Sequence, residues 1–152
     1  KLFLMSKTED IRLFFDRNLF STLNFTQKIS KLFIKNKKGN IVNISSTAGI
    51  DGTEGRIAYS MVKSSINMMT KILSKELSYY NIRVNCVAPG LTETDLMRES
   101  HSEKIINTTL EKQSIKKIGK TTDIANLVYF LASDKSSHIT GQVLRIDGGI
   151  SI

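Results

Sequence analysis

The sequence has few of the residues that build covalent or metal-held frameworks. Its 152 residues include a single cysteine, Cys86, which excludes an internal disulfide and a zinc site built from several cysteines. His101 and His138 have no other metal ligands at suitable spacing, so no metal site is expected. No apolar run reaches the roughly 18–20 residues of a membrane-spanning helix, and the residue order of a signal peptide is absent. We therefore expect a cytoplasmic protein with no metal and no membrane contact.

The charge balance is basic and permits several kinds of partner. Twenty-two Lys and Arg residues against fourteen Asp and Glu residues give a formal net charge of +8, which suits nucleic acid, anionic cofactors or acidic proteins. Basic runs lie at residues 35–38 and 112–120, but no aromatic residues alternate with them to stack on bases. No zinc or helix-turn-helix signal accompanies them, so we expect no nucleic-acid binding.

Strand and helix patterns alternate along the chain. Residues 8–35 have apolar side chains at close to helical spacing, which predicts one long, largely buried helix that the charged segment 35–40 ends. Strands are expected at residues 41–46, 82–87 and 142–146, and further helices at residues 58–80 and 121–132. Residues 47–56 have the pattern of a loop, and residues 91–120 are polar and partly helical.

This alternation predicts an α/β fold with a parallel sheet covered by helices on both faces. Ligands of such sheets bind at the carboxyl ends of the strands. Ser46 ends the first expected strand, and Pro89 and Gly90 follow the second. We therefore look for a ligand site around these residues.

Tyr59 and Lys63 are four residues apart on an expected helix, so they share one face. An ammonium group beside a phenol stabilises the phenolate, and such a tyrosine exchanges protons with an alcohol or carbonyl near neutral pH. Ser46 lies thirteen residues before Tyr59, where its hydroxyl could hold the same oxygen. Taken alone, a Tyr-x-x-x-Lys pair is more often two solvated helix residues, since many helices contain one by chance.

A longer series of motifs gives the pair its context. In chain order these are Asn18, Ser45-Ser46, Tyr59 with Lys63, the run Asn85-x-x-Ala88-Pro89-Gly90-x-x-x-Thr94, and Asp147-Gly148-Gly149. The series resembles the short-chain dehydrogenase/reductase superfamily. Within it, the chain is most similar to 3-oxoacyl-acyl-carrier-protein reductases in four segments: Asn-Ile-Ser-Ser at 43–46, Phe-Leu-Ala-Ser-Asp at 130–134, Ile-Thr-Gly at 139–141 and Asp-Gly-Gly at 147–149.

The resemblance implies a role for each matched residue. Tyr59 would be the general acid of a reduction or the base of an oxidation, and Lys63 would assist it. Ser46 would orient the carbonyl and steady the developing oxyanion. Asn18 would hold a water that links Lys63 to solvent. The implied residues at a nicotinamide cofactor, NADP or NAD with NADP favoured by the resemblance, are Tyr59, Lys63, Pro89, Gly90, Thr92 and Thr94.

The implied activity interconverts a ketone and a secondary alcohol with NAD(P). The expected reaction is reduction of a 3-oxoacyl thioester carried by an acyl carrier protein, in fatty acid biosynthesis. A dehydrogenase of a sugar, polyol or other small alcohol is the alternative. In the family, the Asn18 helix and the Tyr59 helix form a subunit interface, so a homotetramer or homodimer is expected.

The family's cofactor fingerprint, Thr-Gly-x-x-x-Gly-x-Gly, does not occur in this sequence. We therefore expect residues 1–152 to be the C-terminal catalytic part of a single doubly wound, Rossmann-like domain without its N-terminal nucleotide-binding strands. The strand at residues 41–45 would then expose an unpaired apolar edge. A truncated, catalytically inactive chain is the remaining alternative.

Overall fold

The computed structural model describes residues 2–150 and contains a parallel sheet in the order β1-β2-β3. Strand β1 spans Gly39–Ile44, β2 spans Ile82–Pro89 and β3 spans Val143–Ile146. Ile41 lies opposite Val84, and Cys86 lies opposite Val143. The three expected strands and their parallel pairing are confirmed, and β1 lies at one edge of the sheet.

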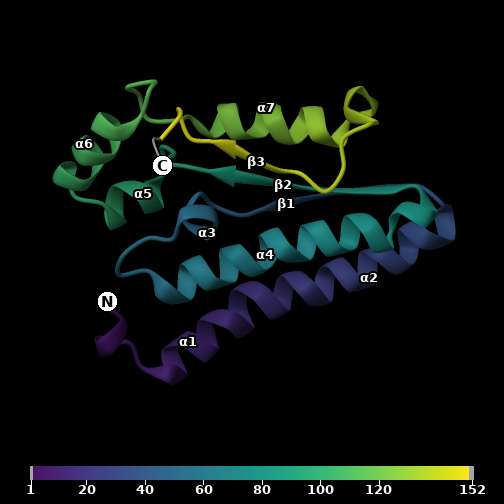
Figure 1. Cartoon of the computed structure of the whole chain (residues 1–152), viewed down its shortest axis with the longest axis horizontal. Coiled ribbons are helices and arrows are strands. Elements are labelled where there is room, and N and C mark those ends of the chain that lie inside the picture. Colours follow the sequence, from purple (N-terminus) through teal and green to yellow (C-terminus); the bar gives the residue numbers. More distant parts are fainter. Residues whose placement is uncertain (1, 151–152) are drawn as a thin grey trace.

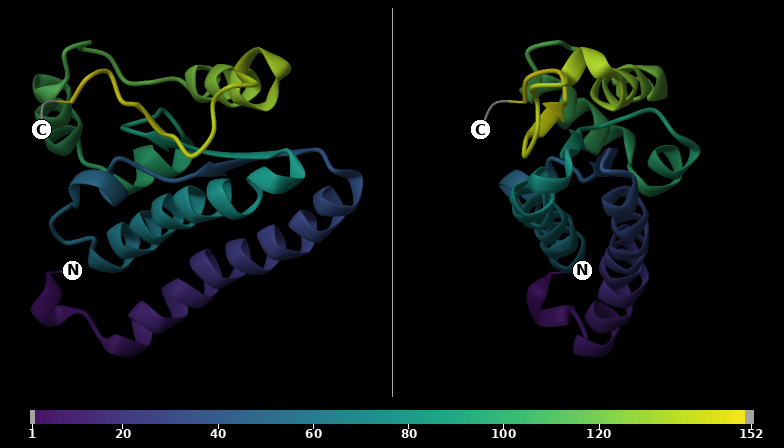
Figure 2. Two further views of the ribbon diagram at one scale, coloured as in Figure 1. Left: turned by 45° about the vertical axis from the view of Figure 1, so that its right-hand side comes forward. Right: turned by 90° about the vertical axis from the view of Figure 1, so that its right-hand side faces the viewer.

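Helices cover both faces of the sheet (Figure 1). Helix α7, Thr121–Ala132, lies over one face, while α4, Ile57–Glu76, and α2, Ser21–Asn36, lie side by side under the other in both views of Figure 2. The buried core joins the sheet to these lower helices through two clusters, Ile41, Leu77, Ile82 and Val84, and Val62, Ile66 and Cys86. The α/β fold is therefore confirmed.

The first helix is as long as expected, but it is not largely buried. It runs from α1, Thr8–Phe15, through a π-helical turn, Asp16–Phe20, into α2, and only Thr26 and Ser30 of α2 are buried. The helix packs on α4 and β1 along one stripe, so its other apolar side chains face outward: Leu13, Phe20, Leu23, Phe25 and Leu32. The expectation of burial was wrong because the spacing of apolar residues predicts a helix but does not reveal how much of its surface packs against other elements of the chain.

The remaining elements agree closely with the expected ones. Helix α4 is followed by a 3-10 turn, Ser78–Tyr80, and the chain turns at Asn81 with φ of 57°. The segment 91–120 holds α5, Asp95–Ser100, and α6, Glu103–Lys112, and further 3-10 turns lie at Phe3–Met5 and Asp134–Ser136. Two details differ: the expected loop 47–56 contains a single helical turn, α3, Ala48–Asp51, and Pro89 is the last residue of β2. No helix within residues 2–150 is long and apolar enough to cross a bilayer.

Asn85 joins the middle of the sheet to the segment before β3. Its side chain is fully buried, its Nδ2 donates to the Ile139 carbonyl at 2.8 Å, and its Oδ1 accepts from the Gln142 N–H at 3.1 Å. Asn85 therefore braces β2 against the segment that leads into β3. These bonds fix where the chain enters β3.

We expect Asn85→Ala to lower the free energy of unfolding of the natural protein by about 2 kcal/mol, because the fully buried Asn85 side chain loses two hydrogen bonds to the backbone. Asn24→Ala, on the exposed surface of α2, is the matched control and should leave stability unchanged or slightly raised. Denaturant unfolding of both variants measures the difference. Equal stabilities would contradict the bracing role.

Candidate active site

Ser46 lies just beyond the carboxyl end of β1. The pairing with β2 continues past the strand, since the Ser45 N–H donates to the Val87 carbonyl at 2.8 Å and the Thr47 N–H to the Pro89 carbonyl at 3.0 Å. Ser45 is buried and donates its hydroxyl to the Lys63 carbonyl at 2.9 Å. Ser46 is left facing the open side of the turn, where its Oγ accepts the Ala48 N–H at 3.2 Å.

Helix α4 brings Tyr59 and Lys63 to the same edge of the sheet. The Lys63 Nζ donates to the Ile44 carbonyl at 3.0 Å and lies 5.8 Å from the centre of the Tyr59 ring. Phe14 packs edge-on against that ring, with centroids 6.3 Å apart. Burial lowers the pKa of Lys63 below its ordinary value, because the ammonium is partly removed from water.

One cavity of about 900 Å³ unites the predicted site residues. Its lining includes seven of the eight residues that the sequence singled out, and these are Ser46, Tyr59, Lys63, Pro89, Gly90, Thr92 and Thr94. Thr94 caps α5, its Oγ1 accepting the Met97 N–H at 3.1 Å, and Thr92 donates to the Gly90 carbonyl at 3.2 Å. The cavity therefore lies at the carboxyl ends of the strands, as the topology predicts.

Asn18 is the residue that the structure does not bring to the cavity. It lies in the π-helical turn, is exposed, and donates through Nδ2 to the Phe14 carbonyl at 3.0 Å. Its own carbonyl accepts the Thr22 hydroxyl at 2.8 Å. Its side chain thus serves its own helix, where the wider π-turn disturbs the regular hydrogen bonds.

Two polar contacts at the cavity were not foreseen from the sequence. Arg145 pairs with Asp51, which lines the cavity, and with Asp147. These carboxylates, Asp51 foremost, raise the pKa of the Arg145 guanidinium. In addition, the Arg56 Nη2 donates to the His101 Nε2 at 2.7 Å, and both residues line the cavity. The Arg56–His101 and Arg145–Asp51 pairs join residues 45 and 94 positions apart, and no local spacing signals them.

The fold and cavity define an α/β protein whose parallel sheet has a cavity at the carboxyl ends of the strands, the place where ligands of such sheets bind. The chain belongs to the short-chain dehydrogenase/reductase family: residues 1–151 match the family model described as enoyl-(acyl carrier protein) reductase. It is 43% identical over 151 residues to the 3-oxoacyl-acyl-carrier-protein reductase FabG of Thermotoga maritima, covering 99% of this chain and 61% of that one. The chain thus spans about three fifths of this relative's length.

Solved structures of the family superpose closely on the chain. A 3-oxoacyl-acyl-carrier-protein reductase from Brucella melitensis matches with a TM-score of 0.94 and 28% identity, over 100% of this chain and 57% of that one. A 7α-hydroxysteroid dehydrogenase, in complex with NADH and 7-oxo glycochenodeoxycholic acid, matches with a TM-score of 0.93 and 30% identity, over 98% of this chain and 58% of that one.

The lowered pKa of Lys63 has a consequence for stability. Below its folded-state pKa the buried ammonium costs stability, and this cost disappears as the pH rises from that pKa towards the ordinary value of 10.5. Lys63→Met removes the charge at every pH. We expect its melting temperature, relative to that of the unsubstituted protein, to be highest near pH 7 and to fall as the pH rises towards 10.5. Thermal unfolding at pH 7 and at pH 10 measures this difference, and Lys28→Met, at an exposed lysine, is the control. If the melting temperature of Lys63→Met relative to the unsubstituted protein did not fall between these pH values, the burial cost at Lys63 would be contradicted.

Proposed function

We propose that the protein to which this chain belongs is an NAD(P)-dependent oxidoreductase that interconverts a ketone and a secondary alcohol, with residues 1–152 as the catalytic part of a single domain. The observation that carries the proposal is the convergence of Ser46, Tyr59 and Lys63 on one cavity at the carboxyl edge of the sheet. A hydroxyl, a phenol and an ammonium together serve proton transfer to a carbonyl oxygen.

Each of the three side chains has a distinct task in this proposal. The Tyr59 hydroxyl gives its proton to the substrate oxygen in reduction and takes it back in oxidation. The Lys63 ammonium, held by the Ile44 carbonyl next to the Tyr59 ring, stabilises the phenolate that remains. The Ser46 hydroxyl donates to the substrate oxygen as negative charge develops there.

The cavity also has groups that fit a nicotinamide nucleotide. Besides Tyr59 and Lys63, hydroxyls of Thr92 and Thr94 and the backbone at Pro89 and Gly90 line the same space, and hydroxyl and ammonium groups suit a ribose, a carboxamide and a phosphate. The cofactor, when bound, supplies or accepts the hydride. We keep Asn18 as the candidate to hold a water on the path from Lys63 to solvent; its Nδ2 donates to the Phe14 carbonyl and its own carbonyl accepts the Thr22 hydroxyl.

We further propose a 3-oxoacyl thioester as the substrate and an acyl carrier protein as its carrier. The curated relatives that match most of the chain at 37–43% identity include FabG proteins from several bacteria. The net charge of +8, with Lys104 and Lys112 at the cavity, complements an acidic carrier. A small-alcohol dehydrogenase is the second candidate, because a hydroxysteroid dehydrogenase superposes equally well.

The test is the loss of NADPH and NADH absorbance with acetoacetyl thioesters, using the natural protein that contains this sequence. A 3-oxoacyl reductase consumes the cofactor, whereas a sugar or polyol dehydrogenase ignores the thioester and oxidises its alcohol with NAD(P). Crotonyl thioester is the comparison substrate, since an enoyl reductase would act on its carbon–carbon double bond. If the protein turned over none of these three substrate classes and bound no NAD(P), the remaining interpretation would be a catalytically inactive chain.

Tyr59→Phe should abolish turnover and leave the fold intact, because it removes the proton donor but keeps the ring that packs on Phe14. We expect a loss of at least about 100-fold in kcat, as for removal of a general acid. Tyr79→Phe, at a fully solvated tyrosine, is the matched control and should keep full activity. Near-normal carbonyl reduction by the Tyr59→Phe variant would contradict the assignment of Tyr59 as the proton donor.

We propose that the outward apolar side chains of α1, α2 and α4 form a subunit interface in a homodimer or homotetramer. The faces carry Phe25, Leu32, Met68 and Ile72, all 47–69% exposed. Clusters of this kind are covered in assembled proteins. Native mass spectrometry that finds only monomers would contradict the interface.

A further inference from the structure

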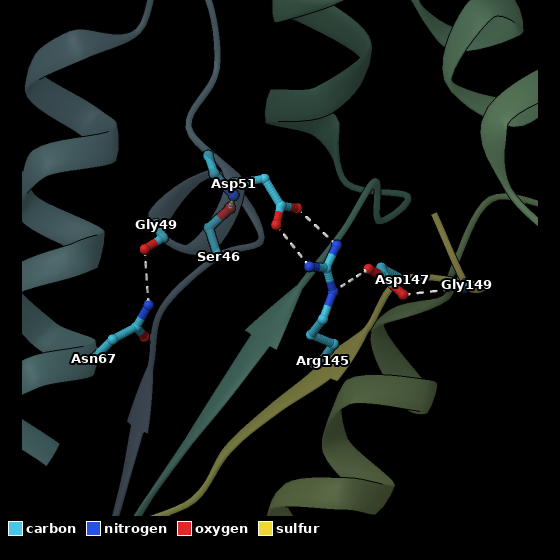
Figure 3. Close-up of polar contacts among 8 residues, drawn as sticks. Ser46, Gly49, Asp51, Asn67, Arg145, Asp147 and Gly149 are labelled. Atoms are coloured by element: carbon cyan, nitrogen blue, oxygen red, sulfur yellow. Dashed lines mark hydrogen bonds and ion pairs between the residues drawn. The ribbon is translucent and has the colours of Figure 1, made fainter. Parts of the chain in front are cut away.

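Arg145 lies on β3 and joins two segments that flank the cavity (Figure 3). Its Nη1 and Nη2 donate to the two carboxylate oxygens of Asp51 at 2.8 and 2.7 Å, and its Nε donates to Asp147 at 2.8 Å. The planar guanidinium thus holds two carboxylates with a fixed geometry. The Asp147 side chain is only 6% exposed and that of Arg145 is 22% exposed, so the bond between these two is shielded from water more than an ordinary surface pair, while the Asp51 side chain is 27% exposed.

Asp51 is the last residue of α3, the turn that follows Ser46. The turn is only four residues long, too short to hold its own conformation, so its position depends on outside contacts. On the α4 side, the Gly49 carbonyl accepts the Asn67 Nδ2 at 3.0 Å, and a Cβ added at Gly49 would come within 2.6 Å of the Lys63 backbone. On the opposite side, the Asp51 carboxylate is bound by Arg145.

Asp147 supports the other wall of the cavity. Its Oδ1 accepts the Gly149 N–H at 3.0 Å, which shapes the chain after β3. A Cβ added at Gly90 would come within 2.6 Å of the Asp147 Cβ, so the backbone at Gly90 rests directly on this residue. The Ser46 turn and the Gly90 loop therefore meet through one arginine.

We propose that Arg145 is a positioning residue for the proposed reaction: through Asp51 it fixes the turn that carries Ser46, and through Asp147 it supports Gly90. Arg145 is not among the residues that line the cavity, so it acts through these neighbours and not on the substrate. The inference rests on the proposed function, because the proper place of Ser46 matters only where a substrate oxygen must be held. A displacement of about 1 Å at such a group costs up to about 100-fold in rate.

The test compares variants of two arginines, made in the natural protein, that both form several hydrogen bonds within the fold. Arg145→Met removes the link at the cavity. Arg83→Met is the matched control, since Arg83 is the second residue of β2, at the end away from the cavity, and donates to the carbonyls of Leu131, Ser133 and Ile139. We expect Arg145→Met to lower kcat about 10-fold to 100-fold. Arg83→Met should lower the melting temperature and leave kcat per folded molecule unchanged.

Two further variants separate positioning from direct contact with substrate. Arg145→Lys keeps the charge but not the two-pronged geometry, so it should recover only part of kcat. The double variant of Arg145→Met with Asp51→Asn should be no slower than the slower single variant, because both break one link. Independent, multiplying losses would show that Asp51 acts on the substrate itself and would overturn the proposal.

Hydrogen exchange gives a readout that does not depend on activity. The backbone N–H groups of residues 49–52 all donate within the turn that starts at Ser46. These N–H groups should exchange faster in Arg145→Met than in the unsubstituted protein, and their exchange rates should be unchanged in Arg83→Met. Unchanged exchange in Arg145→Met would overturn the positioning role. If the unsubstituted protein reduced no ketone, the proposed function would fail, while the exchange data would still decide whether Arg145 holds the turn.

Discussion

The parallel pairing of β1 with β2 is the constraint on which the site depends. The register of the two strands continues into the loops, where Ser45 and Thr47 bond to the carbonyls of Val87 and Pro89. Ser46 and the Pro89-Gly90 turn are thereby brought next to each other at the carboxyl ends of β1 and β2. A shift of register would separate the hydroxyl from the loop that lines the opposite wall, even with every residue unchanged. The cavity is thus a consequence of strand pairing.

The sequence predicts the frame well because its signals are local. Helical spacing, the turn at Asn81 and the Asp123 carboxylate, which accepts the Lys120 N–H at the start of α7, each act within a few residues. The same is true of Tyr59 and Lys63, whose spacing on one helix already puts them on one face. Ser46 is predictable because it ends a strand.

The parts that could not be predicted depend on which surfaces meet. The burial of the first helix was overestimated because its apolar side chains face outward as well as towards α4. Asn18 is another example: its place in a π-helical turn depends on local hydrogen bonding that the residue type does not specify. The link from Asp51 to Arg145 spans 94 positions and has no periodicity, so only the folded chain reveals it.

Two cations close to the cavity are held in opposite ways, and this distinguishes their tasks. Arg145 is bound by two carboxylates, which raise its pKa and fix its side chain in one orientation. Lys63 has a neutral backbone carbonyl as its hydrogen-bond acceptor, and burial lowers its pKa. A cation whose charge is neutralised by carboxylates holds its neighbours in place and interacts only weakly with a charged substrate. A cation that burial destabilises is available to a developing anion next to it, so the stability lost at Lys63 is consistent with a role in proton transfer at Tyr59.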